Sequence, residues 1–228
     1  MCGRYKIEPV ADGWTSLAEL LTGEDLTALR EIEPRRNITP GSLIPVVRWA
    51  HGEPAPKLVQ MLWGLVPPWW KQDKPPTETK NARCESAPEK PMWRDAVKYR
   101  RCLIPATAWY EWTPVIDAET GEVVPHPKRK GEPLKKPQEL ISVDQPTICF
   151  AGLWARAVFR GAEIESAAIV TRASVPPLDR IHDRMPVIVP PDRYREWLDP
   201  SVIDVGLFRE ISEAPPPANF QILDQGPA

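Results

Sequence analysis

The sequence I-C-F-A-G-L-W-A-R-A-V-F, residues 148–159, and the sequence E-I-E-S-A-A-I-V-T, residues 163–171, are both rich in apolar and β-branched or aromatic side chains. Such composition is typical of β-strands, so we predict a strand in each. Further strand-like runs occur at residues 43–50, 58–65, 102–112 and 139–143. The chain therefore has enough predicted strands for a substantial sheet.

Short helical segments are predicted around these strands. Apolar residues between Trp14 and Ile32 have helical spacing, which Gly23 interrupts, whereas residues 35–41 are predicted to form a loop. Other short helices are predicted at residues 93–99, 178–182, 192–198 and 201–212. Strands and helices do not alternate in a regular βαβ order, which favours an α+β fold with a largely antiparallel sheet.

The size and composition of the chain fit one domain spanning residues 1–228. It has 228 residues, of which 42% are hydrophobic and ten are Trp, so it can build a core. Its 29 prolines restrict it to short helices and strands, which argues against a coiled coil or a long-helix bundle. Residues 113–138 are predicted to be a long solvated excursion between two strands.

Charge, cysteine and histidine content exclude several classes of site. The net charge is −2, so no overall positive field attracts nucleic acid. Residues 71–136 nevertheless carry a net charge of +4, which could form a local basic patch or simply a solvated charged face. The four cysteines lack any C-x-x-C spacing and the three histidines are scattered, so we expect no structural metal and no cofactor.

The start of the chain, M-C-G-R-Y-K, has no hydrophobic stretch for export, and no apolar run reaches the roughly 18 residues of a membrane span. We therefore expect no membrane association and a reducing, cytoplasmic location.

Cys2 is the most informative single residue. Methionine before a small second residue is commonly removed, which would leave a cysteine at the N-terminus. Its α-amine and thiol have ordinary pKa values of about 8 and 8.5, so both are partly nucleophilic at neutral pH. With an aldehyde they could form a Schiff base and then a five-membered thiazolidine. The alternative is that Cys2 is a small buried residue without a chemical role.

Three other segments place polar side chains among apolar or aromatic ones. They contain Asn81, Glu111 between Tyr110 and Trp112, and His182 between Ile181 and Asp183. Burial among aromatic rings would raise the pKa of Glu111 towards general acid–base use. The structural alternatives are a turn for Asn81, an outward-facing strand residue for Glu111 and a helix-end residue for His182. Likewise, the arginines of these segments and of M-C-G-R could form surface ion pairs.

Together these segments resemble the SOS response-associated peptidase (SRAP) family of abasic-site-processing proteins. In order along the chain, the resemblance rests on M-C-G-R at 1–4, N-I-T-P at 37–40, W-G-L-V-P-P-W-W at 63–70, N-A-R at 81–83, Y-E-W at 110–112, F-A-G-L-W at 150–154 and I-H-D-R-M-P at 181–186. The sequence departs from the family at Cys84, where a small or hydroxylated residue is usual.

The resemblance implies a fold, a partner and a role for each motif residue. It implies a bent or barrel-like sheet, a monomer, and binding to abasic sites in single-stranded or junction DNA, associated with the nucleoid through that DNA. Cys2 would form a thiazolidine with the ring-opened sugar, Asn81 would hold the amine and the reacting oxygen, Glu111 would move protons at the amine, and His182 would promote ring opening. The DNA-binding residues implied are Arg4, Arg83 and Arg184 for phosphates, and Trp69, Trp70, Trp112 and Pro40 around the bases.

Two other functions remain compatible with the same residues. The first is an N-terminal-nucleophile cysteine peptidase, in which Cys2 attacks an amide with Glu111 or His182 as the base, acting on other proteins or only on its own leader residue. The second is a non-covalent single-strand-binding module that uses arginine and tryptophan side chains alone.

Overall fold

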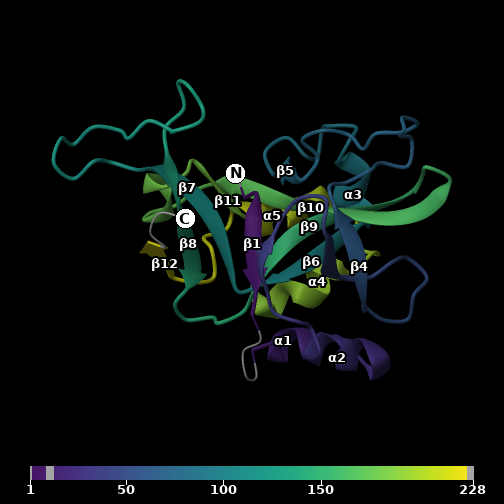
Figure 1. Cartoon of the computed structure of the whole chain (residues 1–228). Coiled ribbons are helices and arrows are strands. Elements are labelled where there is room, and N and C mark those ends of the chain that lie inside the picture. Colours follow the sequence, from purple (N-terminus) through teal and green to yellow (C-terminus); the bar gives the residue numbers. More distant parts are fainter. Residues whose placement is uncertain (1, 9–12, 225–228) are drawn as a thin grey trace.

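The computed structural model describes residues 2–8 and 13–224, and the chain folds into two β-sheets with short helices around them (Figure 1). The strands are β1 (Arg4–Ile7), β2 (Arg35–Ile38), β3 (Leu43–Arg48), β4 (Lys57–Trp63), β5 (Asn81–Arg83), β6 (Arg101–Ala106), β7 (Ala108–Pro114), β8 (Lys135–Ser142), β9 (Ile148–Phe159), β10 (Ala162–Ala173), β11 (Arg184–Pro186) and β12 (Phe220–Asp224). The helices are α1 (Thr15–Ala18), α2 (Gly23–Arg30), α3 (Arg94–Tyr99), α4 (Tyr194–Leu198) and α5 (Val205–Glu213), with 3-10 turns at Leu178–Arg180 and Pro191–Arg193.

One sheet closes into a five-stranded barrel. Its strands follow the order β10, β4, β3, β6, β9, and β9 pairs again with β10. All these pairings are antiparallel except that of β10 with β4. The second sheet, in the order β12, β8, β7, β1, β2, is antiparallel throughout. The predicted α+β fold with a largely antiparallel, barrel-like sheet is therefore confirmed.

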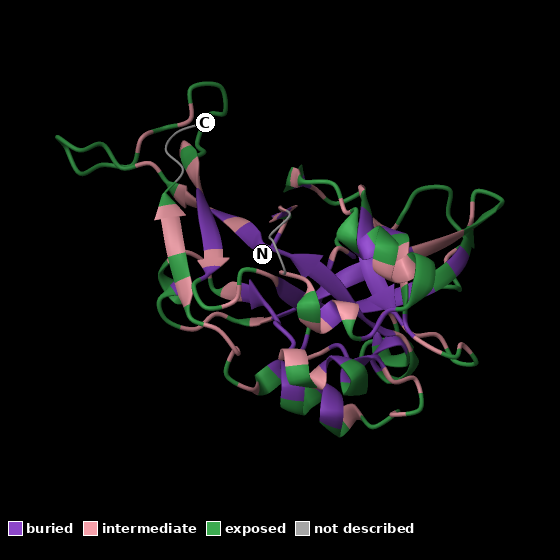
Figure 2. Ribbon diagram, turned by 90° about the horizontal axis from the view of Figure 1, so that it is seen from below, coloured by how far each residue is buried: buried purple, intermediate pink, exposed green. Residues whose placement is uncertain are grey.

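The barrel strands β3, β6 and β9 are buried on both faces over most of their length, which explains their continuous apolar runs. In β9, Phe150 and Trp154 belong to a core cluster that also contains Tyr5 and Trp109 of the second sheet. The alternate residues of β9 pack instead in a second cluster beneath the helices, which supply Trp197 and other side chains. Figure 2 shows this burial concentrated in the strands, with exposed residues on the outer faces of the helices and in the loops.

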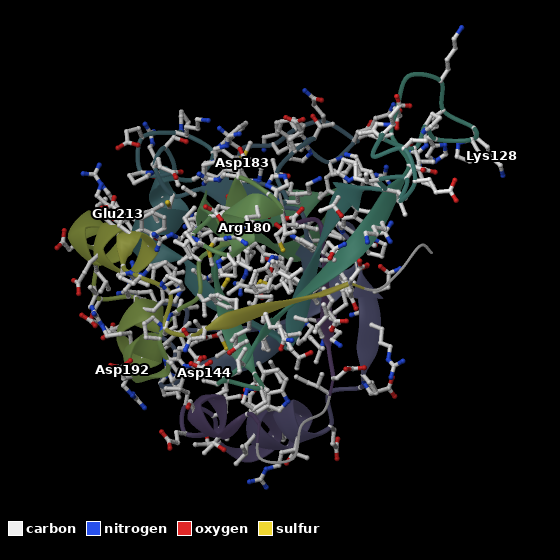
Figure 3. The ribbon with its side chains drawn as sticks, turned by 90° about the vertical axis from the view of Figure 1, so that its left-hand side faces the viewer. Lys128, Asp144, Arg180, Asp183, Asp192 and Glu213 are labelled. Atoms are coloured by element: carbon white, nitrogen blue, oxygen red, sulfur yellow. The ribbon has the colours of Figure 1, made fainter. Side chains whose placement is uncertain are left out.

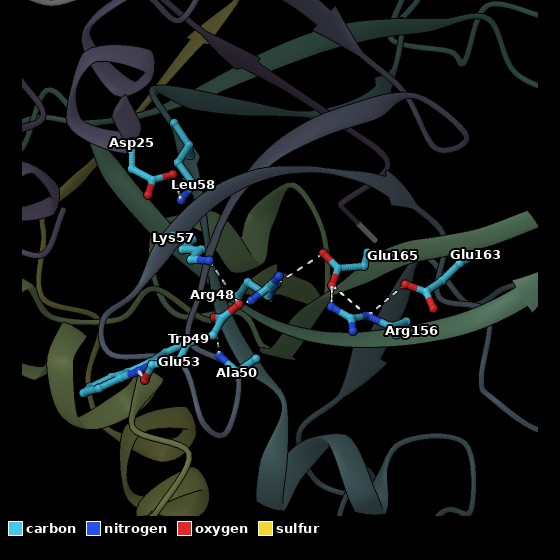
Figure 4. A network of polar contacts seen from close by, with 10 residues as sticks. All are labelled: Asp25, Arg48, Trp49, Ala50, Glu53, Lys57, Leu58, Arg156, Glu163 and Glu165. Atoms are coloured by element: carbon cyan, nitrogen blue, oxygen red, sulfur yellow. Dashed lines mark hydrogen bonds and ion pairs between the residues drawn. The ribbon is translucent and has the colours of Figure 1, made fainter. Parts of the chain in front are cut away.

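A buried ion network joins three barrel strands (Figure 4). Arg48 of β3 is 5% exposed, and its guanidinium contacts Glu53 at 2.6 Å and Glu165 of β10 at 3.2 Å. Glu165 also binds Arg156 of β9 at 2.8 Å, and the Arg48 guanidinium lies 5.0 Å from the centre of the Trp154 ring. Each buried charge therefore has partners, as burial requires.

Two sequence predictions were wrong in their element boundaries. The single strand predicted at 102–112 is divided at Thr107, where the chain leaves the barrel and enters the second sheet. The Thr107 amide donates to the Lys6 carbonyl at 2.9 Å, and its hydroxyl accepts from the Glu8 amide at 3.1 Å. The loop predicted at 35–41 contains β2. This strand lies at the edge of the second sheet, where it pairs on one side only, and its polar residues face solvent.

The long connection between β7 and β8 contains residues 115–134 and carries backbone structure of its own. Asp117 accepts hydrogen bonds from the amides of Glu119 and Thr120, each at 2.9 Å, and closes one turn. Isolated bridges pair Ile116 with Val123 and Pro125 with Pro133. We name residues 116–123 the acidic hairpin and residues 125–133 the basic hairpin.

Among the described residues, no helix is long and apolar enough to cross a membrane.

Candidate functional site

Cys2 and Asn81 lie together where the two sheets meet. Cys2 lies two residues before the start of β1 in the second sheet, and Asn81 begins β5, which pairs in parallel with barrel strand β10. The Asn81 side-chain amide donates to the Cys2 carbonyl oxygen at 2.8 Å. Both residues are buried, and the Asn81 Oδ1 atom has no hydrogen-bond partner among the described residues.

Burial raises the pKa of the Cys2 thiol well above its ordinary range, and the nearby Glu111 carboxylate raises it further. The thiol is therefore protonated at neutral pH in this state of the protein. Met1, whose removal an N-terminal cysteine would require, lies outside the described residues.

Glu111 is a buried carboxyl group in the middle of β7. The strand register places Arg4 opposite Tyr110 and Gln138 opposite Glu111, so β7 is held between β1 and β8. Burial raises the pKa of Glu111 to about 7, with a further increase from Asp183 and a decrease from Lys80. A carboxyl group with this pKa can both accept and donate a proton near neutral pH.

His182 lies after the 3-10 turn Leu178–Arg180 and is partly exposed. Its Nδ1 atom accepts a hydrogen bond from the Arg184 amide at 3.0 Å and lies 2.7 Å from an Asp183 carboxylate oxygen. The first contact requires an unprotonated Nδ1, whereas the second is attractive only when Nδ1 carries a proton. Because burial lowers the pKa of His182, the neutral ring that accepts from Arg184 predominates at pH 7.

The three arginines of the motifs have different surroundings. Arg4 is exposed, and its guanidinium lies 5.0 Å from the centre of the Trp112 ring. Arg83, the last residue of β5, is also exposed. Arg184 is mostly buried: it binds both oxygens of Glu85, at 2.6 and 2.9 Å, and the Thr171 carbonyl at 2.7 Å.

The structure does not bring all the predicted aromatic residues together. Trp69 and Trp70 lie in the loop after β4 with their ring centres 6.1 Å apart. Trp69 is 53% exposed and lines a cleft against Met92 and Arg100, around α3. Pro40 is exposed in the turn between β2 and β3. Only Trp112, of the predicted aromatic residues, lines the cleft that holds Glu111 and His182.

That cleft has a volume of about 460 Å³ and contains residues from three parts of the chain. Glu111 and Trp112 come from β7, and His182 comes from the loop before β11. The third part is the basic hairpin with the start of β8, which contributes His126, Arg129, Glu132, Pro133, Leu134 and Lys135. The cleft thus presents two acid–base groups beside a cationic wall.

Sequence reasoning missed Lys80 and Glu85. Lys80 lowers the pKa of both Cys2 and Glu111, so its positive charge is close to both groups. Glu85 holds Arg184 through two hydrogen bonds. Both residues flank the N-A-R-C motif, and an inspection of the charges beside that motif would have found them. Within residues 2–8 and 13–224, no three His, Cys, Asp or Glu side chains are grouped as a metal ion would require.

The chain is similar to known proteins over most of its length. A family model described as "SOS response associated peptidase (SRAP)" matches residues 1–223. The abasic site processing protein YoaM of Bacillus subtilis is 29% identical over 202 residues, which cover 88% of this chain and 80% of YoaM. The abasic site processing protein YedK of Escherichia coli is 29% identical over 198 residues, which cover 87% of this chain and 79% of YedK.

Solved structures extend the likeness to the fold. A crystal structure of a protein from Bacteroides thetaiotaomicron is similar with a TM-score of 0.73 and 20% identity, covering 98% of this chain and 93% of that one. At this identity the likeness concerns the fold alone.

Proposed function

The chain belongs to the SOS response-associated peptidase family, and from this premise we propose that it captures abasic sites in single-stranded DNA covalently through Cys2. The observation that carries the proposal is the hydrogen bond from Asn81 to the Cys2 carbonyl oxygen, beside a carboxyl group with a pKa near 7. Relatives whose names state that they process abasic sites match most of the chain, which supports the choice of substrate.

The proposed reaction begins after hydrolysis of the Met1–Cys2 bond has freed the α-amine. The amine attacks the aldehyde carbon of the ring-opened sugar, and loss of water gives an imine. The Cys2 sulfur then adds to the imine carbon, and its proton passes to the nitrogen, which closes the thiazolidine. Because the thiol is protonated at neutral pH, attack by the amine comes first.

Glu111 and His182 would move the protons that this sequence needs. Glu111, with a pKa of about 7, takes a proton from the attacking amine and returns one to the hydroxyl group that leaves as water. The neutral His182 accepts the proton of the sugar hydroxyl on Nδ1 during ring opening, once the sugar hydroxyl replaces the Arg184 amide as the donor to that atom, and donates the proton back during reversal. Two separate groups suit two chemically distinct proton transfers.

Selectivity follows from access to the sugar. A missing base leaves its sugar exposed, so the protein avoids the unstacking cost of extruding a nucleotide. Arg4, Arg83 and Arg184 would contact the phosphates beside the lesion, and Trp112 would stack on a base while its other face holds Arg4. Trp69, Trp70 and Pro40 would contact bases farther from the reacting sugar, and the protein would act as a monomer.

The decisive experiment mixes the purified protein with a single-stranded oligonucleotide that contains one abasic site. We expect a denaturation-resistant adduct by intact mass spectrometry, with the mass of the protein lacking Met1 plus the DNA minus one water. Cys2→Ala should form no thiazolidine yet bind undamaged DNA as the unchanged protein does. A full-yield adduct from Cys2→Ala would contradict the mechanism, and cleavage of a peptide without any DNA adduct would favour a cysteine peptidase.

A further inference from the structure

The cleft that holds Glu111 and His182 has a wall that the family motifs do not include. Residues 115–134 extend from the end of β7 and β8 as a long projection (Figure 1). His126, Arg129 and Lys135 of this region line the same cleft as Glu111 and His182. Lys135 also contributes to lowering the pKa of His182, so its charge is near the imidazole ring.

Backbone hydrogen bonds give the projection a defined base. The Val115 amide donates to the Leu134 carbonyl, the Leu134 amide to the Val124 carbonyl, and the Val124 amide to the Val115 carbonyl, at 2.8 to 2.9 Å. This closed triangle joins the three chain segments from which the acidic and basic hairpins extend. Because each hairpin is anchored at its base, its backbone keeps a defined position beside the cleft.

The histidine His126 stabilises the turn of the basic hairpin. The Nδ1 atom of His126 accepts hydrogen bonds from the amides of Lys128 and Arg129, at 3.0 and 3.1 Å, and the His126 amide donates to the Glu132 carbonyl at 2.8 Å. In Figure 3, Lys128 lies at the outer end of the projection, on the same edge of the molecule as Asp183. Lys128 and Lys130 lie outside the lining of the cleft, on the same hairpin as His126 and Arg129, which line it.

Charge is segregated between the two hairpins. The acidic hairpin carries Asp117, Glu119 and Glu122 and no lysine or arginine, whereas residues 126–136 carry five lysines and arginines and only Glu132 as an acid. Two of the five cations are neutralised, Arg129 by Glu132 at 3.1 Å and Lys136 by Asp224. The part of the chain that the structure describes provides no ion-pair partner for the other three cations, Lys128, Lys130 and Lys135.

We propose that the basic hairpin, with Lys135, is a second phosphate-binding surface, which holds the DNA strand where it leaves the cleft on one side of the lesion. The inference rests on the proposed function, because the DNA strand that it places on the basic hairpin is the one that carries the reacting sugar. Unpaired lysines beside a cleft that also exposes an aromatic ring match the chemistry of single-strand binding grooves, where cations follow the backbone and rings stack on bases.

The charge pattern also indicates the path of the DNA strand over the protein surface. Phosphates are attracted to Lys128, Lys130 and Lys135 and repelled by the three carboxylates of the acidic hairpin. The strand should therefore pass along the basic hairpin and away from the acidic one. A net charge of −2 is compatible with such binding because the contact is local.

The test measures the affinity of undamaged single-stranded oligonucleotides by fluorescence anisotropy, in proteins carrying Cys2→Ala so that no adduct forms. Lys128→Ala with Lys130→Ala removes two exposed cations from the basic hairpin. The matched control, Arg30→Ala with Lys57→Ala, removes two exposed cations near α2, away from the cleft. Each pair is also made with Cys2 intact, to measure adduct formation at saturating abasic DNA.

The hairpin pair should weaken binding roughly tenfold near 0.1 M salt and reduce the slope of log K against log salt by about 1.4, since each lost single-strand phosphate contact removes about 0.7. The control pair should change neither. Oligonucleotides extended by about six nucleotides on the 5′ or the 3′ side of the site should show which flank the hairpin holds, because the hairpin pair loses the gain from one extension only.

An affinity and a salt slope equal to those of the control pair would overturn the proposal, as would equal losses on both flanks. If the unchanged protein forms no adduct while the hairpin pair still weakens binding on one flank, the hairpin surface stands and the covalent function fails. If the unchanged protein forms the adduct and the hairpin pair binds normally, the covalent function stands and the hairpin surface fails.

Discussion

The Asn81 side chain reaches across from the barrel to the second sheet and donates a hydrogen bond of 2.8 Å to the carbonyl oxygen of Cys2. Asn81 is held by the parallel pairing of β5 with β10, and Cys2 lies two residues before β1, which pairs with β7. The proposed nucleophile is thus positioned by both sheets, and the relative position of the sheets sets the geometry of the candidate site.

Asn81→Ala should slow adduct formation about 100-fold at saturating DNA, because a misplaced nucleophile loses its alignment with the aldehyde. Binding to undamaged DNA should change little, since Asn81 is a buried, uncharged residue. Single-turnover crosslinking measures the rate. Asn81→Asp, which lacks the N–H donor, should behave like Asn81→Ala; an unchanged rate in both variants would show that the hydrogen bond does not position Cys2.

Glu111 should make the stability of the fold decrease as pH rises. Its pKa is raised from the ordinary value of 4.5 to about 7, so between these values the folded protein binds more protons than the unfolded chain. The stabilisation is complete below about pH 4.5 and is lost as the pH passes 7, by on the order of 3 kcal/mol. Glu111→Gln removes this loss. The free energy of unfolding of the variant, relative to that of the unchanged protein, should therefore be higher at pH 8 than at pH 5.

Urea denaturation at the two pH values measures that difference. Glu210 supplies a contrast, because the hydrogen bond from Arg193 lowers its pKa and its contribution is lost as pH falls. That loss occurs below about pH 4.5, the ordinary pKa of a glutamate, so Glu210→Gln should change the free energy of unfolding by nearly the same amount at pH 8 and at pH 5. A Glu111→Gln effect that is the same at both pH values would mean that the carboxyl group titrates normally.

His182→Ala should slow capture of the closed sugar more than capture of a small open-chain aldehyde, because His182 is assigned to ring opening. Glu111→Gln should slow both reactions alike, because the proposed role of Glu111 is at the amine. Loss of a general acid–base group typically costs roughly 10²- to 10⁴-fold. Single-turnover crosslinking with both aldehydes separates the roles. Equal slowing of both reactions by His182→Ala would assign that residue to the amine or to structure.

Glu85→Gln should raise the affinity for single-stranded DNA by roughly threefold, because Glu85 holds the Arg184 guanidinium and would compete for it with the proposed phosphate. Glu89→Gln is the matched control: it neutralises an exposed carboxylate that pairs with Arg209 at 2.9 Å, elsewhere on the surface. Anisotropy titrations measure both. A Glu85→Gln variant that is less stable but has unchanged affinity would show that Arg184 only holds the loop.

The longest apolar runs could be predicted as strands because their burial on both faces leaves a strong local signal. The division of residues 102–112 at Thr107 could not, since the side chains on either side of it are equally apolar and the change of sheet depends on hydrogen bonds to Lys6 and Glu8. The strand β2 was missed for the opposite reason. Its polar residues form an edge strand that is fixed by its partner β1 rather than by its own composition.

For the site, sequence predicted the candidate residues better than their arrangement. The pKa of Glu111 follows from burial, as its aromatic neighbours suggested. The separation of Trp69 from Trp112, and the pairing of Arg184 with Glu85, depend on which loops fold over which strands, and no local pattern encodes that. The cationic wall of the cleft could not be predicted, because residues 113–138 have a nearly balanced total charge. Only the fold places their acidic and basic residues on two different hairpins.

The two ends of the projection are cross-strand neighbours, since Pro114 pairs with Lys135 in the ladder of β7 and β8. For the rest of the domain, residues 115–134 are therefore an interchangeable hairpin loop, whose length and charge can vary without shifting Glu111 from its place opposite Gln138. The proposed DNA-binding surface can thus vary independently of Glu111 and the residues around it. In an engineered protein, this junction is the natural place to graft a different binding element beside an unaltered active site.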